Sequence, residues 1–135
     1  MAFTEKYILI CDDVRAEPNG KLIVIGLYQD NMLVPQIPFS LPSLSFLVVT
    51  EVSQPGEFTF KAKFANLEVG KAIAQAIGGM KVERPGRAVT VLQFRNVQID
   101  RTGSYQFSLT IDEEAAPFTT TINVMLAVTQ PLAQR

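Results

Sequence analysis

The sequence contains no histidine and no tryptophan, and it has one cysteine, Cys11. Without histidine, a Ser-His-Asp triad, a Cys-His pair and every histidine-ligated metal site are excluded. A single cysteine excludes an intrachain disulfide, a thiolate zinc cluster and an iron–sulfur centre. Because Cys11 lies in the apolar run YILIC, we interpret it as a small buried hydrophobic residue and not as a reactive thiolate.

Charged residues are scarce, at 19% of the chain against about a quarter in ordinary soluble domains. The 12 basic and 13 acidic residues are spread along the chain and form no basic stripe, so nucleic acid is not an expected partner. The charge deficit predicts that a partner or further copies of the chain cover part of the surface. The alternative is a surface of uncharged polar residues, since Thr, Gln and Ser are plentiful.

Long hydrophobic runs are also missing. The run LIVIGLY, residues 22–28, is typical of the longest and falls far short of the ~18 residues of a membrane span, so no membrane partner is expected. The start, MAFTEKYILICDD, has no basic n-region and soon reaches two aspartates, which argues against a secretory signal. We therefore expect a cytoplasmic protein.

What the sequence does contain is alternation of apolar and polar side chains. In residues 57–65, 104–111 and 118–128 the apolar residues fall on one side of an extended chain, and the last of these faces is predicted to reach Leu126 and Val128. Four other segments are rich in Val, Ile, Leu and Phe and are predicted to be more deeply buried strands: KYILICDDV, KLIVIGLYQ, LSFLVVTE and AVTVLQF.

The chain of 135 residues predicts a single domain, residues 1–135, with residues 128–135 as a flexible tail. Turn signals between the strand-like segments favour an all-β fold, a single antiparallel β-sandwich of about seven to nine strands. Residues 69–80 fit either a short helix or an edge strand. We favour the strand because its neighbours are β, and we expect Gly78-Gly79 to end it.

The stretch EPNGK predicts a β-hairpin with a three-residue turn and a bulge at Gly20 in the left-handed conformation. In this register Glu17 lies opposite Lys21. Asp13, Arg15 and Glu17 then alternate in sign along one face of the hairpin, and such exposed pairs define register more than they stabilise.

Asp12 and Asp13 point to opposite faces of one strand and cannot act together as a general acid and base. Asp12 falls on the apolar face, opposite Gly26, where a carboxylate needs donors such as backbone N–H groups, a Ser or Thr hydroxyl or an arginine. We interpret it as a carboxylate that ties down a loop or bulge; the alternatives are a ligand or metal role, or an error in the register. The acidic run 112–114 is interpreted as a solvated turn, with weak calcium binding as the alternative.

Several short motifs together resemble an uncharacterised family of small bacterial and phage-associated proteins. The resemblance covers most of the chain and is densest in residues 10–46. The residues that carry it are CDDVR (11–15), Glu17, Gly20-Lys21, IGLY (25–28), Val34-Pro35, Pro38, Leu41-Pro42, Leu44, Phe46 and GSYQF (103–107). It implies an immunoglobulin-like sandwich, and it implies no activity because the family has no assigned function.

Tyr105 is similar to the tyrosine corner of immunoglobulin-type domains, because Gly103 stands two residues before it and Phe107 two after it. The hydroxyl of such a tyrosine bonds back to the chain. Phe107 departs from the antibody pattern, since it occupies the place of the disulfide cysteine. The alternative is an ordinary half-buried strand tyrosine.

The stretch VPQIPFSLPSL, residues 34–44, is apolar and rich in proline. If it is exposed, Pro35, Pro38 and Phe39 would form a docking patch, and the spacing of Pro35 and Pro38 would be a weak P-x-x-P ligand. The alternative is a crossover that covers the end of the sandwich, with prolines protecting an edge strand.

These features predict a non-enzymatic structural or binding module without catalytic residues, cofactor or metal. We expect it to self-associate as a homo-oligomer or to dock on a larger protein assembly; one concrete form is a virion component such as a phage head decoration protein. The alternative is a free cytoplasmic domain that binds a small ligand or a regulatory partner through Asp12 and Arg15. The candidate interaction residues are Asp12, Asp13, Arg15, Glu17, Gly20, Lys21, Tyr28, Pro35, Pro38, Phe39 and Tyr105.

Overall fold

A computed structural model describes residues 2–112 and 116–127 of the chain. The described residues form nine strands and no helix, and therefore no helix long and apolar enough to cross a membrane. The strands are β1 (Phe3–Ala16), β2 (Leu22–Tyr28), β3 (Asn31–Val34), β4 (Phe39–Val52), β5 (Gly56–Asn66), β6 (Ala72–Val82), β7 (Gly86–Ile99), β8 (Gly103–Ile111) and β9 (Phe118–Leu126). This confirms the predicted all-β sandwich.

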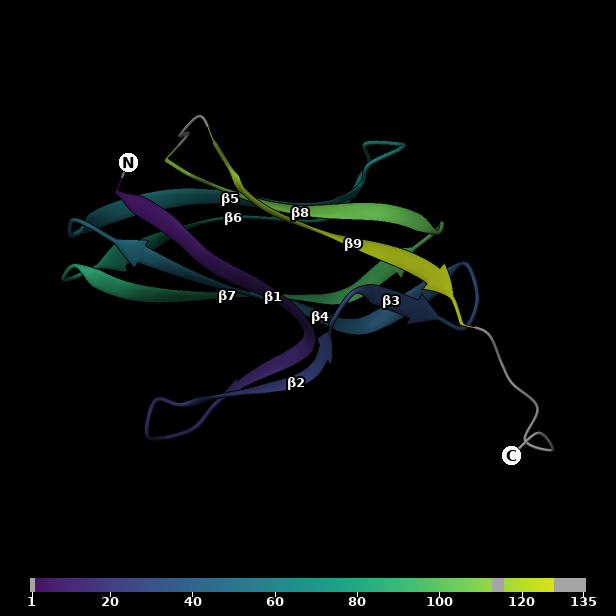
Figure 1. Ribbon diagram of the computed structural model, residues 1–135, viewed down its shortest axis with the longest axis horizontal. Helices are drawn as coiled ribbons and strands as arrows, with labels where there is room; N and C mark the ends of the chain where they lie inside the picture. The colour runs from purple at the N-terminus through teal and green to yellow at the C-terminus, as the bar shows by residue number, and fades with distance from the viewer. Residues whose placement is uncertain (1, 113–115, 128–135) are drawn as a thin grey trace.

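The strands form two facing sheets (Figure 1). One sheet has four strands in the order β2-β1-β4-β7, and the other has five in the order β3-β9-β8-β5-β6. All neighbours run antiparallel except β3 and β9, which are parallel. The chain therefore leaves the four-stranded sheet after β2, contributes β3 to the other sheet, and returns as β4.

The core lies between the two sheets and is built on aromatic rings. The ring of Phe46, on β4, stacks on that of Phe107 with 4.1 Å between their centroids. Phe46 also lies 5.2 Å from Phe64, whose ring stacks on Tyr105 at 5.3 Å. All four side chains are fully buried, so residues from both sheets interlock without a disulfide.

The predicted alternation of β5 and β8 is confirmed, and residues 72–82 form the predicted edge strand. The expectation that Gly78-Gly79 ends this strand is wrong, because β6 continues through both glycines to Val82. A Cβ on Gly78 would lie 2.8 Å from the ring of Phe60, so the missing side chain makes room for that ring. The glycine therefore serves packing within the strand.

Three burial predictions are wrong. The segment AVTVLQF, in β7, was expected to be deeply buried, but among its residues only Leu92 is buried and Val89 is 47% exposed, because the outer face of this edge strand is open. The segment KLIVIGLYQ was expected to be deeply buried, but β2 is exposed along its length except at Tyr28. It is an edge strand beside β1, and the predicted burial required a second layer over it. Leu126, at the end of β9, is exposed instead of facing the core. Val128 and the predicted tail, 128–135, lie outside the described residues, as do residues 113 and 114.

The proline-rich stretch is shorter as a connector than predicted, because β4 already begins at Phe39. Pro35 and Pro38 are exposed, whereas Phe39 packs partly against the core and does not belong to an exposed patch. Pro42 lies inside β4, where the described pairing with β1 has ended and only β7 lies alongside. This is the edge position at which a sheet tolerates proline.

Strand β1 is shared between two partners. Residues 3–11 pair with β4, and residues 10–16 pair with β2. Beyond Cys11 the end of β1 and β2 therefore form a two-stranded ribbon that diverges from β4 (Figure 1). A two-stranded ribbon is marginal on its own, so its shape depends on side-chain contacts at its base.

We predict that Phe46→Ala lowers the free energy of unfolding by about 3–5 kcal/mol, because it leaves a cavity among three other aromatic rings. The measurement is urea unfolding followed by circular dichroism. Ile77→Ala is the control: Ile77 is 79% exposed, so its loss should cost less than about 0.5 kcal/mol. Equal losses for the two variants would contradict the placement of the core.

Candidate functional site

The carboxylate of Asp12 lies at the base of the ribbon and is held by β2. The hydroxyl of Tyr28 donates a hydrogen bond to Asp12 Oδ1 over 2.7 Å. Burial, and next the hydrogen bond to Asp12, raise the pKa of Tyr28 well above its usual value. This hydroxyl therefore keeps its proton. The prediction that Asp12 needs a donor is confirmed, but the donor is a phenol, which the sequence reasoning had not considered.

Gly26 faces Asp12 across the ribbon, as predicted from the hairpin register. Its φ is +69°, a backbone conformation that favours glycine. A Cβ at this position would overlap the Asp12 carboxylate. The small residue, the carboxylate and the tyrosine therefore form one interlocked unit that ties β2 to β1.

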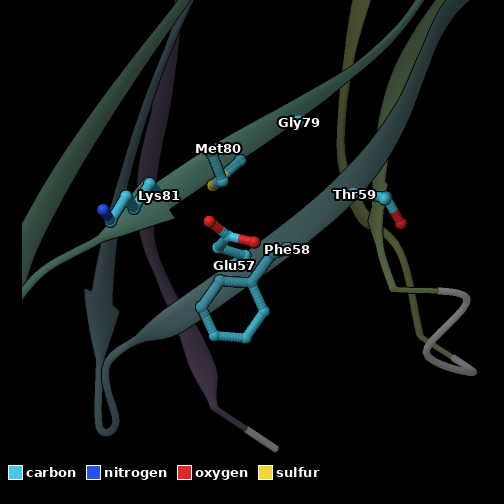
Figure 2. Close-up of a pocket in the computed structure, with 6 residues that line it drawn as sticks. All are labelled: Glu57, Phe58, Thr59, Gly79, Met80 and Lys81. Atoms are coloured by element: carbon cyan, nitrogen blue, oxygen red, sulfur yellow. The ribbon is translucent and has the colours of Figure 1, made fainter.

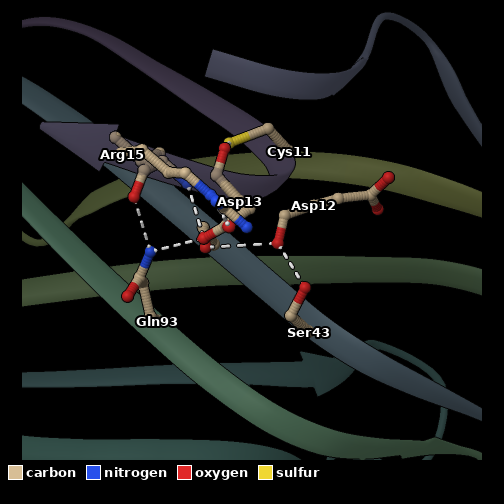
Figure 3. A network of polar contacts seen from close by, with 8 residues as sticks. Cys11, Asp12, Asp13, Arg15, Ser43 and Gln93 are labelled. Atoms are coloured by element: carbon tan, nitrogen blue, oxygen red, sulfur yellow. Dashed lines mark hydrogen bonds and ion pairs between the residues drawn. The ribbon is translucent and has the colours of Figure 1, made fainter. Parts of the chain in front are cut away.

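The backbone of Asp12 is tied to β4. The hydroxyl of Ser43 donates to the Asp12 carbonyl oxygen over 2.7 Å, and Ser45 approaches the same atom at 3.4 Å. Figure 3 shows the Asp12 side chain pointing away from the network around Asp13. The carboxylate and the backbone carbonyl of Asp12 thus both help to fix the place where β1 leaves β4, and we assign the residue a structural role.

Asp13 is the centre of a second network on the opposite face (Figure 3). Its carboxylate accepts hydrogen bonds from Arg15 Nε at 3.0 Å, Gln93 Nε2 at 2.8 Å and the Val14 N–H at 2.9 Å. Gln93 Nε2 also reaches the Val14 carbonyl oxygen at 2.9 Å. Gln93 comes from β7, so this network connects the ribbon to the far strand of the sheet.

The hydrogen bond from Arg15 is the main cause that lowers the pKa of Asp13 below its ordinary value of 3.8. Since Arg15 is engaged with Asp13, and Asp12 points to the other face, the structure does not bring Asp12 and Arg15 together at one ligand site. Burial is the first cause that raises the pKa of Cys11, which is fully buried beside these residues, so the thiol stays protonated.

The hairpin turn has the predicted geometry. The Glu17 N–H donates to the Lys21 carbonyl oxygen at 2.8 Å, and the Gly20 N–H donates to the Glu17 carbonyl oxygen at 3.0 Å. Gly20 has a φ of +88°, as its role in the bulge requires. Lys21 Nζ lies 3.4 Å from a Glu17 carboxylate oxygen, an exposed pair that adds little stability.

Tyr105 has the predicted geometry of a tyrosine corner. Its side chain is fully buried, and its hydroxyl donates to the Arg101 carbonyl oxygen over 2.7 Å. Burial raises the pKa of this hydroxyl. The bond fixes the turn before β8, so Tyr105 stabilises the fold and is not available for binding.

A depression of about 540 Å³ lies between the ends of β5 and β6 (Figure 2). It is lined by Glu57, Phe58, Thr59, Gly79, Met80 and Lys81. It offers one carboxylate, whereas acid–base catalysis by carboxylates needs two. Figure 2 also shows the Thr59 side chain turned away from Glu57; its hydroxyl donates to Asp112 at 3.1 Å. No group of three or more metal-ligating side chains occurs in the described part of the chain.

The outer surface of the four-stranded sheet is apolar, and we call it the apolar face. Its residues are Tyr7, Leu9, Cys11, Leu27, Leu47, Val49, Val89 and Val91. Leu47 and Val49 are buried in its middle, whereas Tyr7, Leu27 and Val89 are 47%, 49% and 47% exposed. The sequence reasoning had predicted a buried strand at β2 and had not recognised this surface.

Both ends of the apolar face carry charges of both signs. At one end Glu51 lies opposite Arg87. At the other, Asp13 and Arg15 lie near Gln93. The outer surface of the five-stranded sheet is different, because it presents mainly polar residues: Lys61, Lys63, Gln75, Gln106, Ser108, Thr110, Thr119 and Thr121. The two surfaces of the sandwich therefore differ strongly in polarity.

Comparison with known families and proteins gives one result. A family model described as "Family of unknown function (DUF6941)" matches residues 6–124, which include most of both sheets. No curated protein matches the chain.

We predict that Gly26→Ala lowers the free energy of unfolding by about 2 kcal/mol or more, because the methyl group adds a collision with Asp12 to the cost of a positive φ. Gly20→Ala is the matched control, since its φ is also positive but no atom lies within 4 Å of its Cβ position. It should cost only about 1–2 kcal/mol of backbone strain. Denaturant unfolding measures both, and a Gly26→Ala cost no larger than that of Gly20→Ala would refute the interlock.

The Asp13 network predicts a loss of stability in acid. Because the folded-state pKa lies below the ordinary value of 3.8, the carboxylate stabilises the fold above about pH 4 and loses this contribution as the pH falls through its folded pKa. Replacing Arg15 by Met should raise the pKa of Asp13 in an NMR titration and flatten the acid limb of the stability profile. An unchanged titration would show that Arg15 does not control this group.

Proposed function

We propose that this chain, which belongs to the family of unknown function DUF6941, is a non-catalytic module that binds protein through the apolar face. The observation that carries the proposal is the exposure of Tyr7, Leu27 and Val89 on one sheet surface, around a centre that is already apolar and buried. An apolar patch with a polar rim is the usual form of a protein interface.

The energetics favour a protein partner. Each half-exposed side chain on the apolar face would contribute about 1 kcal/mol on becoming fully buried. The strand architecture presents these side chains on an extended sheet surface rather than in an enclosed cavity, which suits a surface of similar shape. The charged residues at the ends, Glu51 with Arg87 and Asp13 with Arg15, would orient the partner.

One form of this proposal is a component of a virus particle, such as a phage head decoration protein, in which copies of a small sandwich dock on a shell. Its support is the sequence pattern around CDDVR, together with an apolar face suited to docking on a repeated surface. The tyrosine corner at Tyr105 supports a relation to immunoglobulin-like sandwiches.

The test compares the proteins that co-isolate with tagged wild type, Val89→Asp and Ile77→Asp from the cells that naturally produce the chain. Both variants add one carboxylate at an exposed apolar residue, on opposite outer surfaces of the sandwich. We expect a partner present in stoichiometric amount with wild type and Ile77→Asp, and depleted about tenfold with Val89→Asp.

Equal recovery with Val89→Asp, or no stoichiometric partner with wild type, would contradict the proposal. Thermal unfolding of each variant checks that a loss of binding does not come from a loss of the fold.

A further inference from the structure

We infer that two copies of this chain pair through the outer edge of β2, antiparallel and around a twofold axis at Ile25. The inference rests on the proposed binding role and identifies a second copy as the partner of this strand. Among the described residues β2 pairs with β1 alone, so no strand lies along its other edge. A strand edge of this kind is a template for another strand.

The other sheet edges carry features that oppose strand addition. β3 has four residues and is followed at once by Pro35. β6 carries Lys81, and β7 carries Arg87 and Arg95. The sequence of β2, LIVIGLY, contains no charge and no proline, so neither protects this edge against pairing; its backbone irregularity is the positive φ at Gly26.

The hairpin turn determines which backbone groups of β2 point outward. The Glu17 N–H donates to the Lys21 carbonyl oxygen, so these two residues form a hydrogen-bonded pair. Such pairs alternate with non-hydrogen-bonded ones along an antiparallel ladder, and every second residue of β2 therefore bonds to β1. The residues in the other phase are Leu22, Val24, Gly26 and Tyr28. Gly26, with a φ of +69°, departs from extended backbone, so the regular outward groups are those of the other three.

A register centred on Ile25 places Leu22 opposite Tyr28 of the second copy at both ends of the paired segment, and Val24 opposite Gly26. In this register Ile25 lies opposite Ile25 of the second copy, and Ile23 lies opposite Leu27 of the second copy. These are non-hydrogen-bonded pairs, in which the strands are closely spaced and the side chains touch. These three side chains are 41%, 43% and 49% exposed in the single chain. Pairing through the edge therefore also covers the most exposed apolar residues of the strand.

The charges that flank β2 favour the antiparallel arrangement. Lys21 stands just before the strand and Asp30 soon after it. An antiparallel pair brings Lys21 of one copy near Asp30 of the other, whereas a parallel pair would place like charges side by side. Antiparallel pairing around a twofold axis is also the arrangement that makes one edge complementary to itself.

The pair would join two four-stranded sheets into one sheet of eight. Because the twofold axis stands perpendicular to this sheet, both apolar faces would look to the same side. Their combined surface would double the area offered to a larger assembly, and binding by one face would raise the effective concentration of the other. The edge thus serves self-pairing and the face serves docking, and Leu27 lies where the two surfaces meet.

A charge exchange at the axis tests the inference. Ile25→Asp and Ile25→Lys each place like charges beside one another in the symmetric pair, so each alone should weaken dimerisation about tenfold or more in sedimentation equilibrium. An equimolar mixture of the two should recover dimers near the wild-type level. Val89→Asp and Val89→Lys, on the apolar face, are the matched controls and should leave the dimer unchanged.

A cross-link gives a second measurement that tolerates a weak dimer. In a Cys11→Ala background, Ile25→Cys should form a disulfide-linked dimer on mild oxidation, because a residue at the axis faces its own copy at Cβ distances near those of disulfides. Val89→Cys should stay monomeric. Circular dichroism and the melting temperature of each variant confirm the fold.

Two results together would overturn the inference. The first is a wild-type chain that stays monomeric at about 100 μM, a concentration far above a micromolar Kd, and the second is an Ile25→Cys chain that does not cross-link. A dimer that links through Val89 or is not restored by mixing the two Ile25 variants would also overturn it. The proposed docking role would survive any of these outcomes if the Val89→Asp comparison of co-isolated proteins still held, so the two claims fail separately.

Discussion

The contact between the Asp12 carboxylate, the Tyr28 hydroxyl and the backbone at Gly26 controls how the chain leaves its sandwich. Tyr28, on β2, donates a hydrogen bond to the carboxylate, and Ser43, on β4, donates one to the Asp12 carbonyl oxygen. Gly26 has no side chain and so leaves space for the carboxylate. A half-buried carboxylate requires donors, so this position admits few arrangements. The hairpin turn sets the register of β2 against β1, and this contact holds the two strands in that register at the base of the ribbon.

That register gives the molecule its asymmetry. It directs Leu27 onto the same surface as Tyr7 and Val89, while the ribbon itself extends beyond the strands that could cover it. The opposite surface of the sandwich, over β5 and β8, carries lysine, serine and threonine. A sandwich that stays in water on one outer surface and contacts a partner on the other would have this distribution of side chains.

The networks of Asp12 and Asp13 show how charged residues at a prominent motif can serve architecture. Each carboxylate is satisfied by neighbours on adjacent strands: Asp12 by Tyr28, and Asp13 by Arg15 and Gln93. Because Gln93 comes from β7, the Asp13 network spans the four-stranded sheet. The adjacent acids therefore stabilise a bend and a register on two different faces, and the binding surface that we propose consists of apolar residues beside them.

The features that depend on near neighbours could be predicted from the sequence. The turn at Gly20, the pairing of Glu17 with Lys21, the position of Asp12 opposite Gly26 and the inward face of β8 all follow from turn chemistry and from the two-residue period of a strand. The similarity of Tyr105 to a tyrosine corner led us to expect that its hydroxyl bonds back to the chain, and the acceptor, the Arg101 carbonyl oxygen, lies only four residues away.

Which apolar strands are covered depends on how the strands are arranged in three dimensions, and this could not be predicted from the sequence. LIVIGLY at β2 and LSFLVVTE in β4 are both rich in large apolar residues. The first lies at an edge and is exposed, whereas the second lies between β1 and β7 and is mostly buried. Strand order is set by contacts between residues far apart in the chain, and these leave no local pattern. For the same reason the phenol that holds Asp12 and the amide of Gln93 that reaches Asp13 could be identified only once the strands had been placed side by side.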